Sequence, residues 1–406
     1  MPEISKETTQ NTNSTQPVHY HDYLGLTPIL SAQIPLSGNL PQYDFSKTRT
    51  IDDILEDGVA SSNVNEPKVM AHEEMFFIII HQVYELWFKQ IIFEIDSVRN
   101  ILNVNVVQED QLYTIVARLN RVIEIQKILV QQVGVLETMT PAQFLSFRNS
   151  LGTASGFQSF QFRKLELILG LNKENIEMKN RPPATYMDVL TKDQSEQIQS
   201  LQIESVKFSI LKLVENWLEN TPFLSNNGFD FITEYKKIRL NNYQNELSNY
   251  PKDSPQYQNI DFQRQMFEKM YDEVEYNKLR DESKVKLSFK ARNAALFIML
   301  YSDRPILNLP YQIILQLVQI DELFSTWRYR HSVMVLKMLG RKMGTGGSKG
   351  YDYLMETVNA NRIFSDFANL SSDLIAVDDL PELTPMIELN LKFLFTFLKG
   401  FKPFTN

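Results

Sequence analysis

Apolar residues recur every three or four positions through long stretches of the chain, the spacing that places side chains on one face of an α-helix. In residues 72–102 this stripe includes Phe77, His81, Tyr84 and Phe88. Further stretches with the same spacing are residues 110–138, 141–150, 155–170, 195–219, 259–280, 288–302, 309–341 and 384–399. Strand-like alternation between tight turns is rare, so the pattern predicts an all-α fold.

Changes in composition along the chain suggest how it is organised. Residues 1–18 are rich in Thr, Asn, Gln and Ser, and we expect them to form a disordered tail because they have too little apolar surface to offset the entropy of ordering. Residues 19–406 are expected to form one large helical domain. Residues 226–288 are charged and rich in tyrosine, and we expect them to form a small helical lobe appended to that domain.

Composition excludes several classes of function. The 406 residues carry a formal charge of −8 from interspersed acidic and basic residues, so the chain has no basic footprint for nucleic acid. With no cysteine, the chain cannot form disulfides, thiolate nucleophiles or cysteine-ligated metal centres. No signal peptide is recognisable, and no uninterrupted apolar run approaches the roughly 18 residues of a membrane span. We therefore expect a cytoplasmic protein that acts without nucleic acid or membrane partners.

Histidine is scarce, which limits the possible metal chemistry. His72 and His81 are nine positions apart, so at about 100° per residue they lie on opposite faces of one helix and cannot share a metal. The HExxH zinc pattern fails because HEEMF has Phe76 at the position of the second histidine. The five histidines of the chain are His19, His21, His72, His81 and His331.

His81 and His331 both lie on apolar stripes rich in aromatic residues and methionine. Trp327 is four residues before His331, and Met334 is three residues after it. Each histidine could be a core residue whose ring hydrogen-bonds to a backbone carbonyl. Alternatively, a flat apolar cofactor such as haem could lie between two helices, with one histidine on its iron and the other facing the open coordination position. Periodicity alone does not choose between the two interpretations.

Arg148 is a second candidate for a functional role. Phe144 and Leu151 share its helix face, and Phe147 precedes it. A guanidinium in such apolar surroundings needs an anion, because an unpaired buried charge costs several kcal/mol. That anion could be an internal Asp or Glu, or it could be the carboxylate of a ligand held by paired hydrogen bonds.

Three long blocks of the sequence resemble the tryptophan 2,3-dioxygenase family. They are HEEMFFIIIHQVYELWFKQIIFEIDSVR (72–99), LVQQVGVLETMTPAQFLSFRNSLGTASGFQSFQFR (129–163) and WRYRHSVMVLKMLGRKMGTGGSKGYDYL (327–354). The resemblance follows the family's order and extends over nearly the whole chain beyond the tail. It implies an all-α enzyme with ferrous haem b, assembled as a homotetramer that is a dimer of dimers. Such an enzyme inserts O2 across the indole C2–C3 bond of L-tryptophan to give N-formyl-L-kynurenine, the first step of the kynurenine pathway.

The resemblance also implies roles for residues that match the family's motifs. His331 in WRYRH would bind the haem iron, and His81 in FIIIH would be the distal histidine near the indole nitrogen. Phe77 would line the indole pocket. Arg148 would bind the substrate carboxylate, and Thr345 in GTGG would contact the amino-acid end of tryptophan.

Two further segments match positions close to the family's active site. The block HYHDYLGL (19–26) is similar to the N-terminal segment that reaches the neighbouring protomer's pocket, which implicates Tyr20, Tyr23 and Leu24. Ser155 and Gly156, in ASGFQS, match positions beside the haem.

The glycine-rich stretch 342–354 fails as a phosphate-binding loop, because Ser348 precedes Lys349 and a helical pattern leads into it. Its glycines would instead allow the backbone to approach a ligand closely. Two other classes of function stay open from sequence. One is a haem-based oxygen or redox sensor without turnover, which would keep His331 but need neither Arg148 nor Thr345. The other is a non-catalytic helical scaffold whose histidines belong to the core.

Overall fold

The computed structural model describes residues 20–40, 69–104, 106–152, 154–171, 187, 190–226, 229–341 and 350–392. In these ranges nearly all regular structure is helical, which confirms the all-α fold. The described strands are β1 (Ser225–Asn226) and β2 (Phe229–Asp230), which form one short antiparallel pair.

The chain divides into two compact units. The smaller unit comprises residues 1–81 and 142–151, and the larger unit comprises residues 82–141 and 152–406. The boundary between the units falls inside helix α4 (His72–Leu102), whose bounds agree with the predicted stretch 72–102.

The smaller unit contains an N-terminal arm, residues 20–40, and the segment that ends at Arg148. Gly25 separates the two short helices of the arm in a left-handed conformation with φ of 59°, which glycine adopts without strain. Pro141 begins α6, as the sequence predicted, because its fixed φ suits the first position of a helix. The elements of this unit, apart from the first turns of α4, are α1 (Tyr20–Tyr23), α2 (Leu26–Leu30), α6 (Pro141–Arg148) and η1 (Asn149–Leu151).

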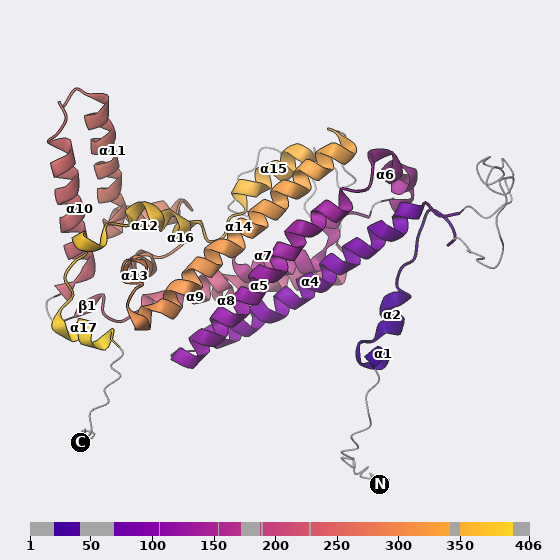
Figure 1. The fold of residues 1–406 in the computed structure, drawn as a ribbon, viewed down its shortest axis with the longest axis horizontal. Helices are drawn as coiled ribbons and strands as arrows, with labels where there is room; N and C mark the ends of the chain where they lie inside the picture. The colour runs from indigo at the N-terminus through magenta and orange to yellow at the C-terminus, as the bar shows by residue number, and fades with distance from the viewer. Residues whose placement is uncertain are drawn as a thin grey trace, which may run out of the picture. The chain divides into compact units, whose positions relative to one another are not determined.

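The larger unit is a bundle in which α5 and α14 lie side by side and α15 packs against α14 (Figure 1). Besides residues 82–102 of α4, its helices before residue 250 are α5 (Glu109–Leu136), η2 (Gly156–Gln158), α7 (Phe160–Leu169), α8 (Lys192–Phe208), α9 (Ile210–Glu219) and α10 (Phe231–Leu247). The later ones are α11 (Pro255–Met270), α12 (Glu273–Asp281), α13 (Phe289–Leu300), α14 (Pro305–Leu339), α15 (Tyr351–Ala360), α16 (Ser365–Asn369), η5 (Leu370–Asp373), η6 (Val377–Asp379) and α17 (Pro385–Asn390).

Residues 195–219, predicted as one helix, form two helices, α8 and α9. Ser209 separates them with an extended backbone, φ −70° and ψ 157°. Its hydroxyl accepts a hydrogen bond from the backbone N–H of Lys212 and so caps α9. Apolar periodicity continues across this break, which is why the pattern alone did not show it.

Residues 226–288 fold largely as α10, α11 and α12, and α10 packs against α11. Figure 1 shows these two helices as a pair joined by a short turn. The stretch is therefore helical as expected, while its separation from the rest as an appended lobe stays a prediction.

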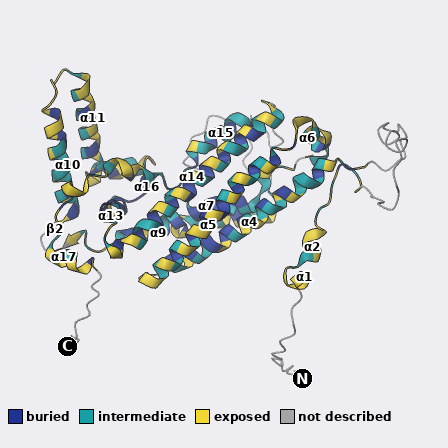
Figure 2. Cartoon of the chain, in the orientation of Figure 1, coloured by how far each residue is buried: buried dark blue, intermediate teal, exposed yellow. Residues whose placement is uncertain are grey.

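The core of the larger unit is best seen at α13. Nearly every residue of this helix is buried, including Ala291, Ala294, Ala295 and Phe297, and α9, α14 and α16 pack around it (Figure 2). The small alanine side chains permit this close approach of neighbouring helices.

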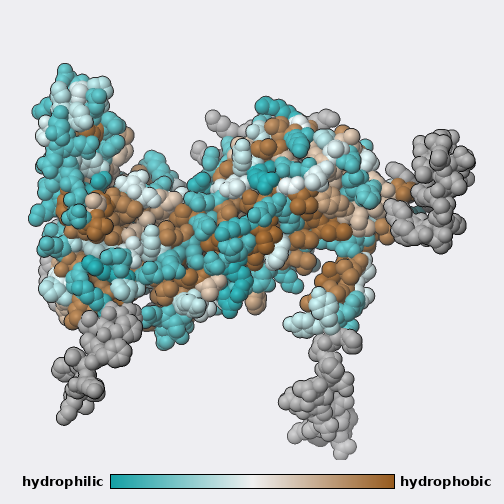
Figure 3. All heavy atoms as spheres, in the orientation of Figure 1, coloured by the Kyte–Doolittle hydropathy of each residue, from teal (hydrophilic) through white to brown (hydrophobic). Residues whose placement is uncertain are grey.

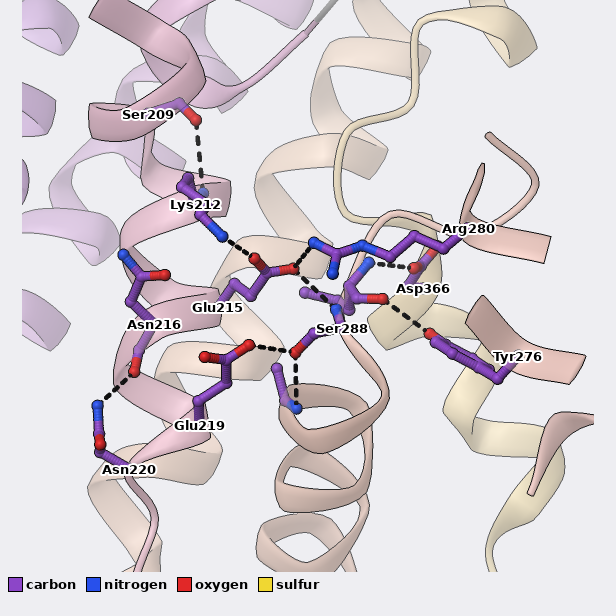
Figure 4. A network of polar contacts seen from close by, with 12 residues as sticks. Ser209, Lys212, Glu215, Asn216, Glu219, Asn220, Tyr276, Arg280, Ser288 and Asp366 are labelled. Carbon is purple, nitrogen blue, oxygen red and sulfur yellow. Dashed lines mark hydrogen bonds and ion pairs between the residues drawn. The ribbon is translucent and has the colours of Figure 1, made fainter. Parts of the chain in front are cut away.

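A buried carboxylate beside α13 joins three separate segments (Figure 4). Glu215 of α9 accepts hydrogen bonds from Lys212, from Arg280 Nη2 at 2.7 Å and from the backbone N–H of Ser288 at 2.8 Å. These charge-assisted hydrogen bonds offset the cost of burying the carboxylate.

By length and composition alone, α4 is the one helix in the described residues apolar enough to cross a membrane. Core helices of globular proteins meet the same test. Two of its carboxylates bind polar partners within the bundle: Glu85 accepts a hydrogen bond from Ser159 at 2.6 Å, and Glu94 pairs with Arg121 at 2.7 Å. These interactions indicate a helix that packs against protein.

Candidate active site

The predicted distal histidine, His81, is oriented by its own helix. Its Nδ1 lies 2.7 Å from the backbone carbonyl oxygen of Phe77, one turn earlier in α4. A carbonyl oxygen can only accept, so Nδ1 carries the proton and in the neutral ring the lone pair is on Nε2. The Phe77 ring packs against the imidazole, with centroids 4.1 Å apart. Phe77 therefore holds the histidine with both its backbone and its ring.

An aromatic cluster joins the start of α4 to α6 within the smaller unit. Phe77 lies 5.8 Å from Phe144 and 5.5 Å from Phe147, between ring centroids, and Phe147 is completely buried. A hydrogen bond of 2.7 Å from Gln143 to Glu73 joins the same two helices. These contacts fix α6 against the turns of α4 that carry Phe77.

Arg148 is the last residue of α6 and is half-buried. A cation at this end of a helix is favoured by the backbone carbonyls that the helix leaves unpaired. Phe147, the preceding residue, is buried in the aromatic cluster and so anchors this end of α6. The smaller unit thus contains three of the predicted substrate-binding residues on two helices that pack together: Phe77, His81 and Arg148.

The predicted iron ligand, His331, belongs to the larger unit and lies on α14. Its imidazole is stacked on the indole of Trp327, one turn earlier, with centroids 5.5 Å apart and an interplanar angle of 6°. A planar ring held parallel to a second ring has little freedom to rotate about its side-chain bonds. The stacking therefore fixes the plane of His331.

Trp327 is itself surrounded by aromatic side chains. Its ring centroid is 6.1 Å from Tyr84, 6.4 Å from Phe88 and 5.3 Å from Phe162. The hydroxyl of Tyr84 donates to the backbone oxygen of Leu129 at 2.9 Å, and burial raises the pKa of Tyr84 to about 12. Tyr84 therefore remains protonated near neutral pH and keeps this donor role.

Two arginines beside His331 hold α14 in place. Arg330 donates to the backbone oxygen of Val130 at 2.8 Å and pairs with Glu137 at 3.1 Å, both contacts being toward α5 and its C-terminal end. The buried Arg328 pairs with Glu166 of α7 at 3.3 Å. Because Arg330 contacts α5 while Arg328 contacts α7, the two arginines together oppose rotation of the helix that carries His331.

Ser155 and Gly156 begin the 3-10 helix η2 in the larger unit. Ser155 caps it, accepting a hydrogen bond from the N–H of Phe157 at 3.3 Å, while Gln158 Oε1 accepts from the N–H of Ser155 at 3.1 Å. A Cβ added at Gly156 would meet no atom within 4 Å. Gly156 is exposed, so a side chain could be accommodated at this position.

The donor chemistry around His331 fits a haem. Among the residues that the structure describes, no group of three or more His, Cys, Asp or Glu could hold a metal ion. The imidazole of His331, packed among aromatic side chains, would suit a haem, in which the porphyrin itself supplies most of the ligands of the iron.

The structure describes three of the remaining predicted site residues, Tyr20, Tyr23 and Leu24, but not Thr345. Tyr20 and Tyr23 are 74% and 78% exposed on α1, and Leu24 follows them. Thr345 lies outside the described residues. Sequence reasoning named Trp327 as a neighbour of His331 without foreseeing the parallel stacking. It missed Glu74, whose only sequence signal was a carboxylate in the first turn of α4.

The helical fold and the two histidines, each packed by aromatic residues, define an all-α protein with a histidine–aromatic cluster in each of its two units. Residues 45–374 match the family model described as tryptophan 2,3-dioxygenase. The proteins named tryptophan 2,3-dioxygenase from Bdellovibrio bacteriovorus and Alteromonas mediterranea are each 40% identical to this chain, over 93% of it and 98% of the relative. The protein of that name from Dictyostelium discoideum is 42% identical over 81% of this chain and 83% of its own. The chain belongs to the tryptophan 2,3-dioxygenase family and is an enzyme of it.

Proposed function

We propose that this enzyme uses ferrous haem b to cleave the indole C2–C3 bond of L-tryptophan with O2, forming N-formyl-L-kynurenine as the first step of the kynurenine pathway. Both oxygen atoms enter the product, one at each carbon of the broken bond, so the reaction needs no external reductant. The observation that carries the proposal is the family match over most of the chain, together with the presence of each motif residue assigned below.

His331 is proposed to bind the iron, and Ser155 and Gly156 to lie beside the haem. The parallel indole of Trp327 supports the first role because it holds the imidazole in one plane. The match of ASGFQS to the family's motif supports the second. When bound, haem supplies the redox chemistry that activates dioxygen.

His81 is proposed to face the indole nitrogen of the substrate. With Nδ1–H donated to the carbonyl of Phe77, the lone pair on Nε2 can accept a hydrogen bond from the indole N–H. Phe77 is proposed to line the indole pocket, because its ring already packs on the imidazole. Together they would orient the indole plane and exclude water from it.

Arg148 and Thr345 are proposed to bind the amino-acid end of tryptophan. The planar guanidinium of Arg148 can form paired hydrogen bonds with a carboxylate. Such a polar clamp discriminates strongly against substrates that lack the carboxylate, because the arginine would then lose its anion. Specificity for tryptophan over simple indoles would come mainly from this end.

We further propose a cytoplasmic homotetramer, a dimer of dimers, in which Tyr20, Tyr23 and Leu24 reach the neighbouring protomer's pocket. The exposure of both tyrosine rings in the single chain supports this role, because large exposed aromatic side chains are suited to bury against a partner. Light scattering during size-exclusion chromatography measures the assembly directly.

The proposed activity is tested by purifying the chain from cells supplied with haem precursor and recording its Soret band. We expect oxygen-dependent conversion of tryptophan to a product with the absorbance of N-formylkynurenine. A His331→Ala variant should lose the Soret band and the activity together. A haem-loaded wild-type protein that consumes no tryptophan in air would refute the proposal.

A further inference from the structure

A buried carboxylate at the start of α4 holds the N-terminal arm. Glu74 is 1% exposed and accepts from the backbone N–H of Leu36 at 2.7 Å and that of Ser37 at 2.9 Å. The hydroxyl of Ser37 also donates to Glu74, and accepts from the backbone N–H of Ala71 at 2.8 Å. Both oxygens of the carboxylate are therefore directed at the arm.

A second connection lies beside the first. The backbone N–H of Met70 donates to the carbonyl oxygen of Asn39 at 2.9 Å, and Asn39 forms a parallel bridge with Val69. The arm is thus attached over residues 36–39 to the residues that lead into α4. We call this attachment, with Glu74 at its centre, the arm anchor.

The arm anchor joins segments that are far apart in sequence. Ser37 and Glu74 are separated by 37 residues, so the contact between them is not imposed by the local sequence. Holding the arm at Glu74 raises the effective concentration of the arm's side chains at whatever surface they contact.

The arm anchor also lies on the helix that bears the proposed substrate-binding residues. Phe77 and His81 are three and seven positions beyond Glu74, spacings that place all three on one side of α4. The arm in turn carries Tyr20 and Tyr23. Its Leu30, Ile34 and Leu36 are exposed, and the space-filling view shows apolar surface on this segment (Figure 3). A change at the arm anchor would therefore move the arm relative to the turns of α4 that carry Phe77 and His81.

We infer that Glu74 is a positioning residue for substrate binding: it sets the place of the N-terminal arm relative to the helix that carries Phe77 and His81. This inference rests on the proposed function, in which Tyr20, Tyr23 and Leu24 of the arm reach the neighbouring protomer's tryptophan pocket, so that an arm displaced from its own α4 would also be misplaced in that pocket. Glu74 touches no substrate atom. It acts through Ser37 and Leu36, and loss of its charge is expected to weaken tryptophan binding while haem content is unaffected.

The test compares Glu74→Gln with Glu109→Gln in the haem-loaded full-length enzyme. Both residues are acids in the first turn of a long helix, but Glu109 is exposed on α5. A glutamine at position 74 presents an N–H2 group to one of the arm's donors, so at least one charge-assisted hydrogen bond is lost. For Glu74→Gln we expect KM for L-tryptophan and its equilibrium Kd to rise on the order of tenfold, with kcat within about twofold of wild type. The control Glu109→Gln should keep the wild-type values.

Ser37→Ala supplies an independent variant at the other side of the same contact. The combined Ser37→Ala, Glu74→Gln protein should bind tryptophan little more weakly than Glu74→Gln alone, because both changes remove one interaction. The Soret band and haem content should match wild type in all four proteins. If Glu74→Gln does not fold, Ser37→Ala must show the rise in KM by itself.

The positioning role would be overturned if Glu74→Gln and Ser37→Ala bound tryptophan with wild-type affinity. It would also be overturned if these variants lost kcat, haem and affinity together. An inactive wild-type enzyme would instead refute the proposed function, and the positioning role with it. The two failures are therefore separated by the wild-type assay.

Discussion

Trp327 and His331 lie parallel, one turn apart on α14, with ring centroids 5.5 Å apart and 6° between the planes. The indole is in turn surrounded by Tyr84, Phe88 and Phe162. The orientation of the proposed iron ligand is therefore determined by aromatic packing inside the larger unit. An imidazole fixed in one plane loses less rotational freedom when it binds iron, which favours cofactor retention.

Replacing Trp327 should weaken haem retention. Trp327→Leu keeps an apolar side chain but removes the stacked ring, a contact worth about 0.5–1.5 kcal/mol beyond burial. We expect haem transfer to excess apomyoglobin to accelerate roughly threefold to tenfold. Trp327→Phe preserves a ring and should transfer haem at a rate closer to wild type. Equal transfer rates for the Leu and Phe variants would argue against a role for stacking.

Arg148→Ala should raise KM for tryptophan by roughly 10- to 100-fold, because a charge-assisted interaction worth about 1.5–3 kcal/mol is lost. Tryptamine, which lacks the carboxylate, should be a poor substrate of wild type and be affected little by the substitution. Arg148→Lys retains the charge without the planar fork, and its KM for tryptophan should lie between those of wild type and Arg148→Ala. If Arg148→Ala reduced the turnover of tryptophan and tryptamine by the same factor, Arg148 would have no carboxylate-binding role.

The arm anchor should weaken in acid. Burial alone would raise the pKa of Glu74, but the hydrogen bonds from the Ser37 hydroxyl and from the N–H groups of Leu36 and Ser37 outweigh it and lower that pKa below the ordinary 4.5. A carboxylate whose pKa is lower in the folded state stabilises that state above its unfolded pKa, and this stabilisation disappears as pH falls through the folded value.

Thermal unfolding of wild type and Glu74→Gln between pH 7 and pH 3 measures that contribution. We expect wild type to be more stable by a constant margin down to about pH 4.5, and the margin to shrink steadily at lower pH. A margin that grew in acid would mean that the carboxyl is protonated in the folded protein.

The Glu215 network should be a major source of stability in the larger unit. Glu215→Gln removes the buried anion shared by Lys212 and Arg280, which are themselves partly exposed, so we expect a loss of about 1.5–3 kcal/mol, the value of a hydrogen bond to a charged group. Glu275→Gln removes an exposed, solvent-screened ion pair with Lys278 and should cost far less. Urea unfolding of the two variants makes the comparison, and equal losses would contradict the importance of burial.

Periodicity predicted much of the fold because most of these helices bury one side. The stripe in residues 72–102 yielded α4 with the same bounds, and the stripe in 309–341 yielded α14 even though Pro310 lies within it. Pro310 lies in the second turn of α14 and lacks the N–H that would bond to the carbonyl of Ile306, yet the helix continues to Leu339. The break at Ser209 escaped prediction because it preserves the apolar spacing and depends on a local cap.

The site was only partly accessible to sequence. His81 and His331 could be selected because so few histidines exist, but spacing could not show that Nδ1 of His81 bonds to its own helix or that His331 stacks on Trp327. Both features depend on side-chain rotamers. Glu74 was missed because its partners, Leu36 and Ser37, are distant in sequence, and no periodic pattern relates them.

The most direct test of the central claim is a spectral titration of the haem-loaded enzyme with L-tryptophan, first without oxygen and then with air admitted. The account predicts a saturable change in the Soret band under anaerobic conditions, weakened by Arg148→Ala and absent in His331→Ala. On admission of oxygen, one N-formylkynurenine should form for each tryptophan and each O2 consumed. A Soret band that does not respond to tryptophan, with no product after aeration, would contradict it.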